Sequence, residues 1–120
     1  ENSKQKYFCK FGSMKLIDQR ISELKKLCDR YHVSELYVFG SVAKDKFTDK
    51  SDIDFLVRFS GVDLFDYFDN YMDFKDNLSD LFSREIDLVE IQTLKNPILK
   101  RSIDRDKIIL YGREDSKVVV

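Results

Sequence analysis

The sequence has little cysteine, proline or glycine, no excess of charge of either sign and no long apolar run. Cys9 and Cys28 are the only cysteines and have no metal-ligand spacing, which favours a cytoplasmic protein with reduced thiols. No apolar run approaches the roughly 18 residues of a membrane helix, and no signal peptide is visible. The formal net charge of −1 argues against a general nucleic-acid binder. We therefore expect neither membrane association nor direct nucleic-acid binding.

The composition that remains is that of one compact domain. The chain has 120 residues, of which 42% are hydrophobic and 13% aromatic, enough for a single core. Residues 1–13 mix polar, charged and aromatic side chains without a period, and Gly12-Ser13 directly precedes Met14. We predict that 1–13 is an added leader or a flexible extension, that 14–112 is the folded domain and that 113–120 is a loose tail.

Apolar periodicity predicts an α/β order of elements. Helices are expected at 14–31 and 64–82, strands at 36–39, 52–59, 85–91 and 107–111, and a short helix from Pro97 after Asn96. Cys28 lies on the apolar stripe of the first helix and is predicted to be a small buried residue. Periodicity does not determine the order or direction of the strands.

The helix at 64–82 is rich in aromatic residues. Its predicted apolar stripe consists of Phe65, Phe68, Tyr71, Met72, Leu78 and Leu81. We predict that its aromatic side chains are mostly core, with a surface for a partner protein as the alternative.

A short motif after the first strand indicates chemistry. Gly40-Ser41 is followed by ten residues and then by Asp52-Ile53-Asp54 at the start of the second strand. Aspartates at i and i+2 of a strand point to the same face, roughly 6–7 Å apart at Cα. Such carboxylates suit Mg²⁺, which is commonly bound by one or two of them plus substrate phosphates. Glycine lets the backbone approach a phosphate, and serine adds a hydroxyl donor. This combination is typical of phosphoryl or nucleotidyl transfer.

The motif resembles that of the polymerase-beta-like nucleotidyltransferases. The longer segments 39–44 and 51–57 are similar to the minimal nucleotidyltransferases, the antitoxin-type members in particular, and the resemblance covers 14–112. It implies the nucleotidyltransferase fold, which is a small mixed β-sheet packed against helices with the acids on one open face.

The resemblance also implies roles for individual residues. Asp52 and Asp54 would hold two Mg²⁺ ions, with a solvated strand end as the alternative reading. Asp87 would be the third carboxylate of the site, binding metal and taking part in catalysis by orienting or deprotonating the acceptor hydroxyl. The alternative for Asp87 is a solvent-facing charge on an edge strand. Glu85 and Glu90 are predicted to be solvent-facing bystanders.

ATP is the implied substrate, and four residues are predicted to contact its phosphates: Gly40, Ser41, Lys44 and Ser51. A tight turn is the alternative for Gly40 and Ser41, and a turn or strand-start hydroxyl for Ser51. Lys44 stands where many relatives have arginine, and Asp45 where glycine is common. Both departures would alter nucleotide affinity more than the reaction.

The implied function is that of an antitoxin in a toxin–antitoxin module of the type VII kind. Such a protein transfers AMP from ATP to a tyrosine of a HEPN-domain ribonuclease toxin. The acceptor would dock as a separate protein, or a second subunit would help to build its site, so a homo- or hetero-oligomer is expected. Two alternatives stay open: a binding antitoxin without catalysis, and a small-molecule nucleotidyltransferase.

Overall fold

The computed structural model describes residues 12–40 and 52–112. Their helices are α2 (Gly12–Gln19), α3 (Ile21–Arg30), α4 (Leu64–Phe82), the 3₁₀ helix η1 (Ile91–Thr93) and α5 (Pro97–Asp106), and their strands are β1 (Val33–Phe39), β2 (Ile53–Phe59), β3 (Ile86–Glu90) and β4 (Ile108–Gly112). The predicted tail lies outside the described residues, as does the predicted leader except for Gly12 and Ser13, which begin α2. No helix in these ranges combines the length and the apolar character that a bilayer crossing requires.

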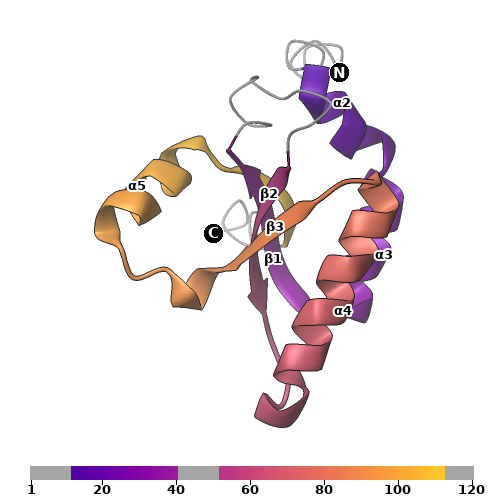
Figure 1. The fold of residues 1–120 in the computed structure, drawn as a ribbon, viewed down its shortest axis with the longest axis vertical. Helices are drawn as coiled ribbons and strands as arrows, with labels where there is room; N and C mark the ends of the chain where they lie inside the picture. The colour runs from indigo at the N-terminus through magenta and orange to yellow at the C-terminus, as the bar shows by residue number, and fades with distance from the viewer. Residues whose placement is uncertain (1–11, 41–51, 113–120) are drawn as a thin grey trace.

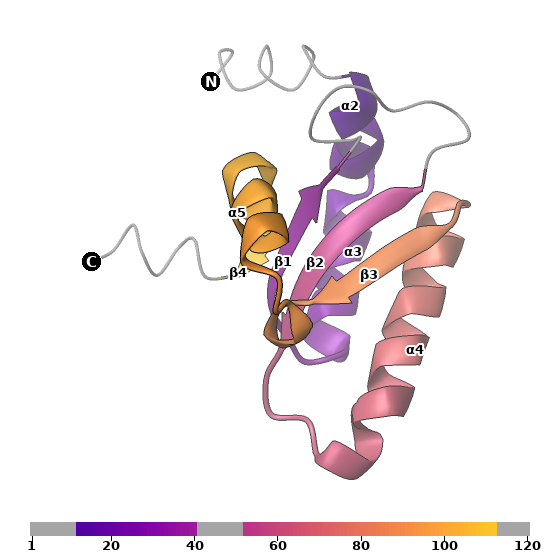
Figure 2. The same cartoon turned by 60° about the vertical axis from the view of Figure 1, so that its left-hand side comes forward.

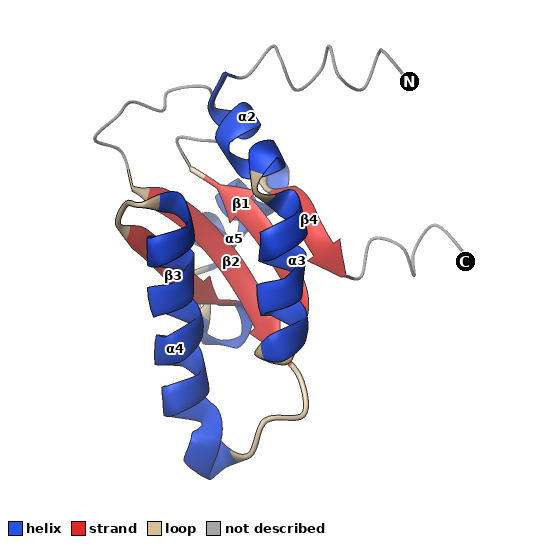
Figure 3. Ribbon diagram, turned by 90° about the vertical axis from the view of Figure 1, so that its right-hand side faces the viewer, coloured by secondary structure: helices blue, strands red, loops and turns tan. Residues whose placement is uncertain are grey.

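The strands form one mixed four-stranded sheet in the order β3-β2-β1-β4. β1 is antiparallel to both β2 and β4, whereas β2 and β3 are parallel. Helices α3 and α4 cover one face of this sheet, and α5 lies on the opposite side (Figures 1 and 3). The predicted α/β fold with a small mixed sheet is therefore confirmed.

The main core lies between the sheet and the pair α3 and α4. Ile53, Phe55 and Val57 of β2 are fully buried there, which leaves Asp54 on the other face as the strand period requires. Cys28 of α3 is also fully buried, and this burial raises the pKa of its thiol to about 12. The prediction that Cys28 is a small buried residue is confirmed.

Helix α4 has the predicted bounds, but its buried stripe differs from the predicted one. Phe65 and Phe68 are 96% and 68% exposed, whereas Phe74, Leu78 and Phe82 are buried. The first turn of α4 extends past the ends of the strands, so its side chains have no sheet to cover (Figure 1). The prediction that Phe65 and Phe68 belong to the core is wrong for this reason.

The predicted helix at 14–31 is in fact two helices. Arg20 leaves the helical conformation with ψ near 13° and separates α2 from α3. Ile17 before the break and Leu24 after it are both buried, so the apolar period continues across Arg20. A continuous period carries no signal of such a break, which is why the sequence did not reveal it.

An aromatic layer fixes α4 against the sheet. The ring of Phe59, at the end of β2, packs edge-on against Tyr67, Tyr71 and Phe74 at centroid distances of 5.7, 6.4 and 5.8 Å. The hydroxyl of Tyr71 also donates a hydrogen bond to the carbonyl of Leu88. β3 is an edge strand, and edge strands present unpaired backbone groups. The bond from Tyr71 gives one of these carbonyls a partner on α4. Helix α4 thereby stabilises the strand that carries Asp87.

Replacing Phe74 with alanine tests the contribution of this layer. Phe74 is fully buried, so we expect Phe74→Ala to lower the free energy of unfolding by about 3–5 kcal/mol. The matched control is Phe65→Ala in the same helix, which removes a 96% exposed ring and should change it by less than about 0.5 kcal/mol. Urea denaturation of dilute protein measures both. Equal losses in the two variants would contradict the assignment of the core.

Candidate active site

Two aspartates lie side by side on the face of the sheet opposite α3 and α4. Asp54 of β2 and Asp87 of β3 are direct partners in the parallel register of these strands. Neighbouring strands are about 4.7–4.9 Å apart, so carboxyl groups on the same face of partnered residues come into contact. Asp54 is half-buried and Asp87 is exposed. Ile86 and Leu88, which flank Asp87, are buried on the opposite face of the sheet, so Asp87 faces the same side as Asp54.

The pair is electrostatically crowded. The pKa of Asp54 is raised from 3.8 to about 6, first by its burial, then by the negative charge of Asp87 and a hydrogen bond with it, and last by the charge of Asp52. Two carboxyl groups that share a hydrogen bond must share a proton as well. A divalent cation placed between them would relieve the same repulsion, so this donor set fits a Mg²⁺ site.

Asp52 is the third acid of the group. It directly precedes β2 and is exposed, and its charge reaches Asp54. Within 12–40 and 52–112 no three acidic, histidine or cysteine side chains are gathered closely enough to form a ready metal cluster. For these acids to coordinate Mg²⁺, their side chains would have to rotate and substrate phosphates would have to supply further ligands. This fits Mg²⁺, which is usually bound by only one or two protein carboxylates together with substrate phosphates.

Gly40 has a structural role beside these acids that the sequence did not reveal. Its φ is +74°, and a Cβ built on it would lie 2.1 Å from Oδ2 of Asp54. The preceding residue, Phe39, is the antiparallel partner of Asp54, which explains the close approach. Only glycine both adopts this backbone conformation readily and leaves room for the Asp54 carboxyl group. The predicted phosphate contact of Gly40 remains a prediction.

The other predicted phosphate-binding residues are Ser41, Lys44 and Ser51. All three lie in 41–51, outside the described residues. The described residues on either side of this segment are Gly40 and Asp52, and both are neighbours of Asp54.

An ion pair with a buried carboxylate lies on the same face of the sheet, further along β1 and β2. Glu35 is buried, and its carboxylate accepts a hydrogen bond from the Tyr37 hydroxyl (2.7 Å) and pairs with Nε of Arg58 (3.0 Å). Glu35 and Arg58 are cross-strand partners. This group was absent from the sequence-based prediction, although opposite charges on two adjacent strands were the available signal.

The two glutamates predicted to face solvent differ from each other. Glu85 is exposed, as predicted, whereas Glu90 is buried and the prediction for it is wrong. Glu90 ends β3, and its carboxylate accepts a hydrogen bond from the backbone N–H of Gln92 (2.7 Å). This contact begins η1 and gives the buried carboxylate a partner, which the strand pattern alone does not reveal.

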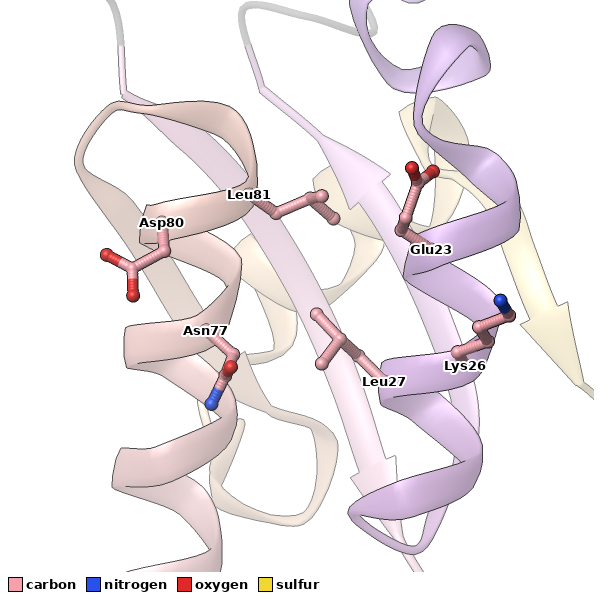
Figure 4. A pocket seen from close by; sticks show the side chains of 6 residues that line it. All are labelled: Glu23, Lys26, Leu27, Asn77, Asp80 and Leu81. Atoms are coloured by element: carbon pink, nitrogen blue, oxygen red, sulfur yellow. The ribbon is translucent and has the colours of Figure 1, made fainter.

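A shallow groove of about 370 Å³ lies on the other side of the molecule, between α3 and α4 (Figure 4). Leu27 and Leu81 point into it, and four polar residues surround them: Glu23, Lys26, Asn77 and Asp80. The sheet separates this groove from Asp54 and Asp87, so it is not part of the candidate active site.

Comparison with protein families identifies one that matches most of the chain. The family is described as "Polymerase beta, Nucleotidyltransferase" and matches residues 22–116. This stretch includes Gly40 and all three acids of the site.

Proteins of similar sequence occur in Methanocaldococcus jannaschii. One, named "Putative protein adenylyltransferase MJ0128", is 42% identical over 84 residues, which are 70% of this chain and 83% of the relative. A second, "Putative protein adenylyltransferase MJ1379", is 33% identical over the same shares of the two chains.

Solved structures share the fold. One described as "Structure of putative minimal nucleotidyltransferase" has a TM-score of 0.65 and 29% identity, over 78% of this chain and 92% of the other. Another is the Shewanella oneidensis complex of a tri-AMPylated HEPN toxin with an MNT antitoxin, with a TM-score of 0.58 and 17% identity over 85% and 77% of the chains. A toxin–antitoxin structure with AMP-PNP has a TM-score of 0.60 and 20% identity over 78% and 74%.

Substitution of Gly40 by alanine tests its role beside Asp54. We expect Gly40→Ala to lower the free energy of unfolding by more than Gly61→Ala does. Gly61 has a nearly identical φ of +76°, but no atom lies within 4 Å of a Cβ built on it. Gly61→Ala should therefore lower the free energy of unfolding only by the conformational cost of about 1–2 kcal/mol. Urea denaturation of both variants separates the collision with Asp54 from the backbone strain. Equal losses would show that the Asp54 carboxyl group moves aside freely.

Proposed function

This chain belongs to the polymerase beta family of nucleotidyltransferases, and we propose that it transfers AMP from ATP to a hydroxyl group of a partner protein. The observation that carries the proposal is the pairing of Asp54 with Asp87 beside Gly40, on the face of the sheet away from the main core. A half-buried carboxyl group whose pKa is raised by burial and by neighbouring acids, as that of Asp54 is, is typical of a functional site.

The acids would act together with Mg²⁺. Asp52 and Asp54 would hold two ions and Asp87 would contribute to the same site, because carboxylates are the ligands that Mg²⁺ prefers. When bound, the ions supply the positive charge that neutralises the triphosphate and the leaving pyrophosphate.

Residues of the chain would handle the substrate and the proton. Gly40 and Ser41 would seat the β- and γ-phosphates, with Lys44 and Ser51 adding contacts to them. Asp87 would orient the acceptor hydroxyl and accept its proton. The acceptor oxygen would then form a bond to the α-phosphorus as the bond from that phosphorus to the bridging oxygen breaks, releasing pyrophosphate. The exposed position of Asp87 leaves it accessible to a large acceptor.

The proposed acceptor is a tyrosine of a HEPN-domain toxin, which makes this chain the antitoxin of such a pair. Support comes from the relatives named as protein adenylyltransferases and from the fold shared with an MNT antitoxin that is bound to a tri-AMPylated HEPN toxin. The shared fold of a toxin–antitoxin structure that contains AMP-PNP is consistent with ATP as the donor.

Transfer of label from α-³²P-ATP to a HEPN-domain protein tests the proposal. We expect Mg²⁺-dependent labelling by the wild type and a loss of about two orders of magnitude or more in Asp52→Asn/Asp54→Asn, because several kcal/mol of transition-state stabilisation disappear with the metal ligands. The matched control is Asp76→Asn/Asp80→Asn, which removes two exposed acids of α4 and should label like the wild type.

Other outcomes identify the alternatives. A stable complex of the two proteins without label would favour a binding antitoxin. Label on small hydroxylated acceptors in place of the protein would favour a small-molecule nucleotidyltransferase. Label that persists in Asp52→Asn/Asp54→Asn would contradict the assignment of these acids.

A further inference from the structure

Two exposed apolar patches lie at the start of two helices, and their charges are opposite. The first, which we call the α4 patch, contains Leu64, Phe65 and Phe68, of which Leu64 and Phe65 are 89% and 96% exposed. Three exposed acids accompany them: Asp63, Asp66 and Asp69. No basic residue occurs between Asp63 and Asp69, so the α4 patch is purely acidic.

The second, which we call the α5 patch, contains Ile98 and Leu99, which are 78% and 48% exposed. Three exposed cations accompany them: Lys95, Lys100 and Arg101. Neighbouring large apolar side chains this exposed, with polar residues around them, are typical of an interaction surface.

Few of the charges in the two patches have a partner among residues 12–40 and 52–112. Among the described residues, Asp63, Asp66 and Asp69 form no ion pair, and neither do Lys95 and Arg101. Lys100 has only a 3.6 Å contact with Asp104 in its own helix.

The position of the cations in α5 adds to this imbalance. The first turn of α5 has no acidic residue, and the cations Lys100 and Arg101 follow it directly. The positive end of the helix dipole disfavours cations there, so acids from outside the helix would be stabilising.

The two patches cannot meet within one molecule. Helices α4 and α5 lie on opposite sides of the sheet, as two views of the fold agree (Figures 1 and 2). An acidic apolar patch and a basic apolar patch on opposite sides of the same chain are complementary between two copies.

We propose that a second copy of this chain docks through these patches, with the α4 patch of one copy against the α5 patch of the other. Because the two patches lie on opposite sides of the sheet, the contact is head-to-tail, and repeating it would build a ring or a filament of copies. The leucine, isoleucine and phenylalanine side chains would be buried at the centre, and the opposite charges would pair around them. This inference concerns assembly and is independent of the reaction proposed above.

Charge reversal gives a sharp test by sedimentation equilibrium. Asp66→Lys/Asp69→Lys makes the α4 patch basic, and Lys95→Glu/Arg101→Glu makes the α5 patch acidic. We expect the wild type to self-associate at micromolar concentrations and at least about a tenfold rise in the dissociation constant of each variant alone, because like charges then face each other. An equimolar mixture of the two variants should associate again, since contacts between the two variants then pair opposite charges.

Two control variants change the charge elsewhere. Lys25→Glu/Lys26→Glu on α3 and Asp76→Lys/Asp80→Lys near the end of α4 reverse exposed charges outside both patches, and should leave self-association unchanged. Circular dichroism confirms that each variant is folded. Three results would each overturn the proposal. The wild type could stay monomeric, the control variants could weaken association as much as the patch variants do, or the mixture of the two patch variants could fail to associate.

Discussion

The parallel register of β2 and β3 is the constraint on which the rest of the structure depends. The same pairing aligns Ile53 with Ile86 and Phe55 with Leu88 in the core, and Asp54 with Asp87 on the other face. A slip by one residue would place the acids in the core and the apolar side chains in solvent. Burial of the apolar partners therefore stabilises a register in which two carboxyl groups repel each other, and the core offsets the cost of the acidic site.

The surrounding elements preserve this register. Helix α4 packs its aromatic layer on Phe59 and binds the carbonyl of Leu88, the neighbour of Asp87. At the other side of Asp54, Gly40 lets β1 approach without displacing the carboxyl group. The backbone positions of Asp54 and Asp87 are thus held by contacts on both sides of the pair. Rotation of the carboxyl side chains is still needed to complete a metal site.

Much of the fold could be predicted from the sequence, because β2, β3 and α4 have clear apolar periods and Asn96-Pro97 is a strong helix start. The strand period alone predicts that Asp54 and Phe55 point to opposite faces of the sheet. Its pairing with Asp87 needed the family resemblance, since periodicity does not determine which strands are neighbours. The rest depends on three-dimensional contacts: the break at Arg20, the exposure of Phe65 and Phe68, and the collision that excludes a side chain at Gly40. None of these leaves a local pattern in the sequence.

The central claim is that Asp54 and Asp87 form a crowded pair that a cation relieves. A residue-specific NMR titration of the Asp54 carboxyl carbon in the metal-free protein tests it directly. The account predicts a pKa of about 6 for Asp54. This pKa should fall in Asp87→Asn, which removes a negative charge, and on addition of Mg²⁺ with ATP, which favours the ionised form. A pKa near the ordinary 3.8 that neither change moves would contradict the account.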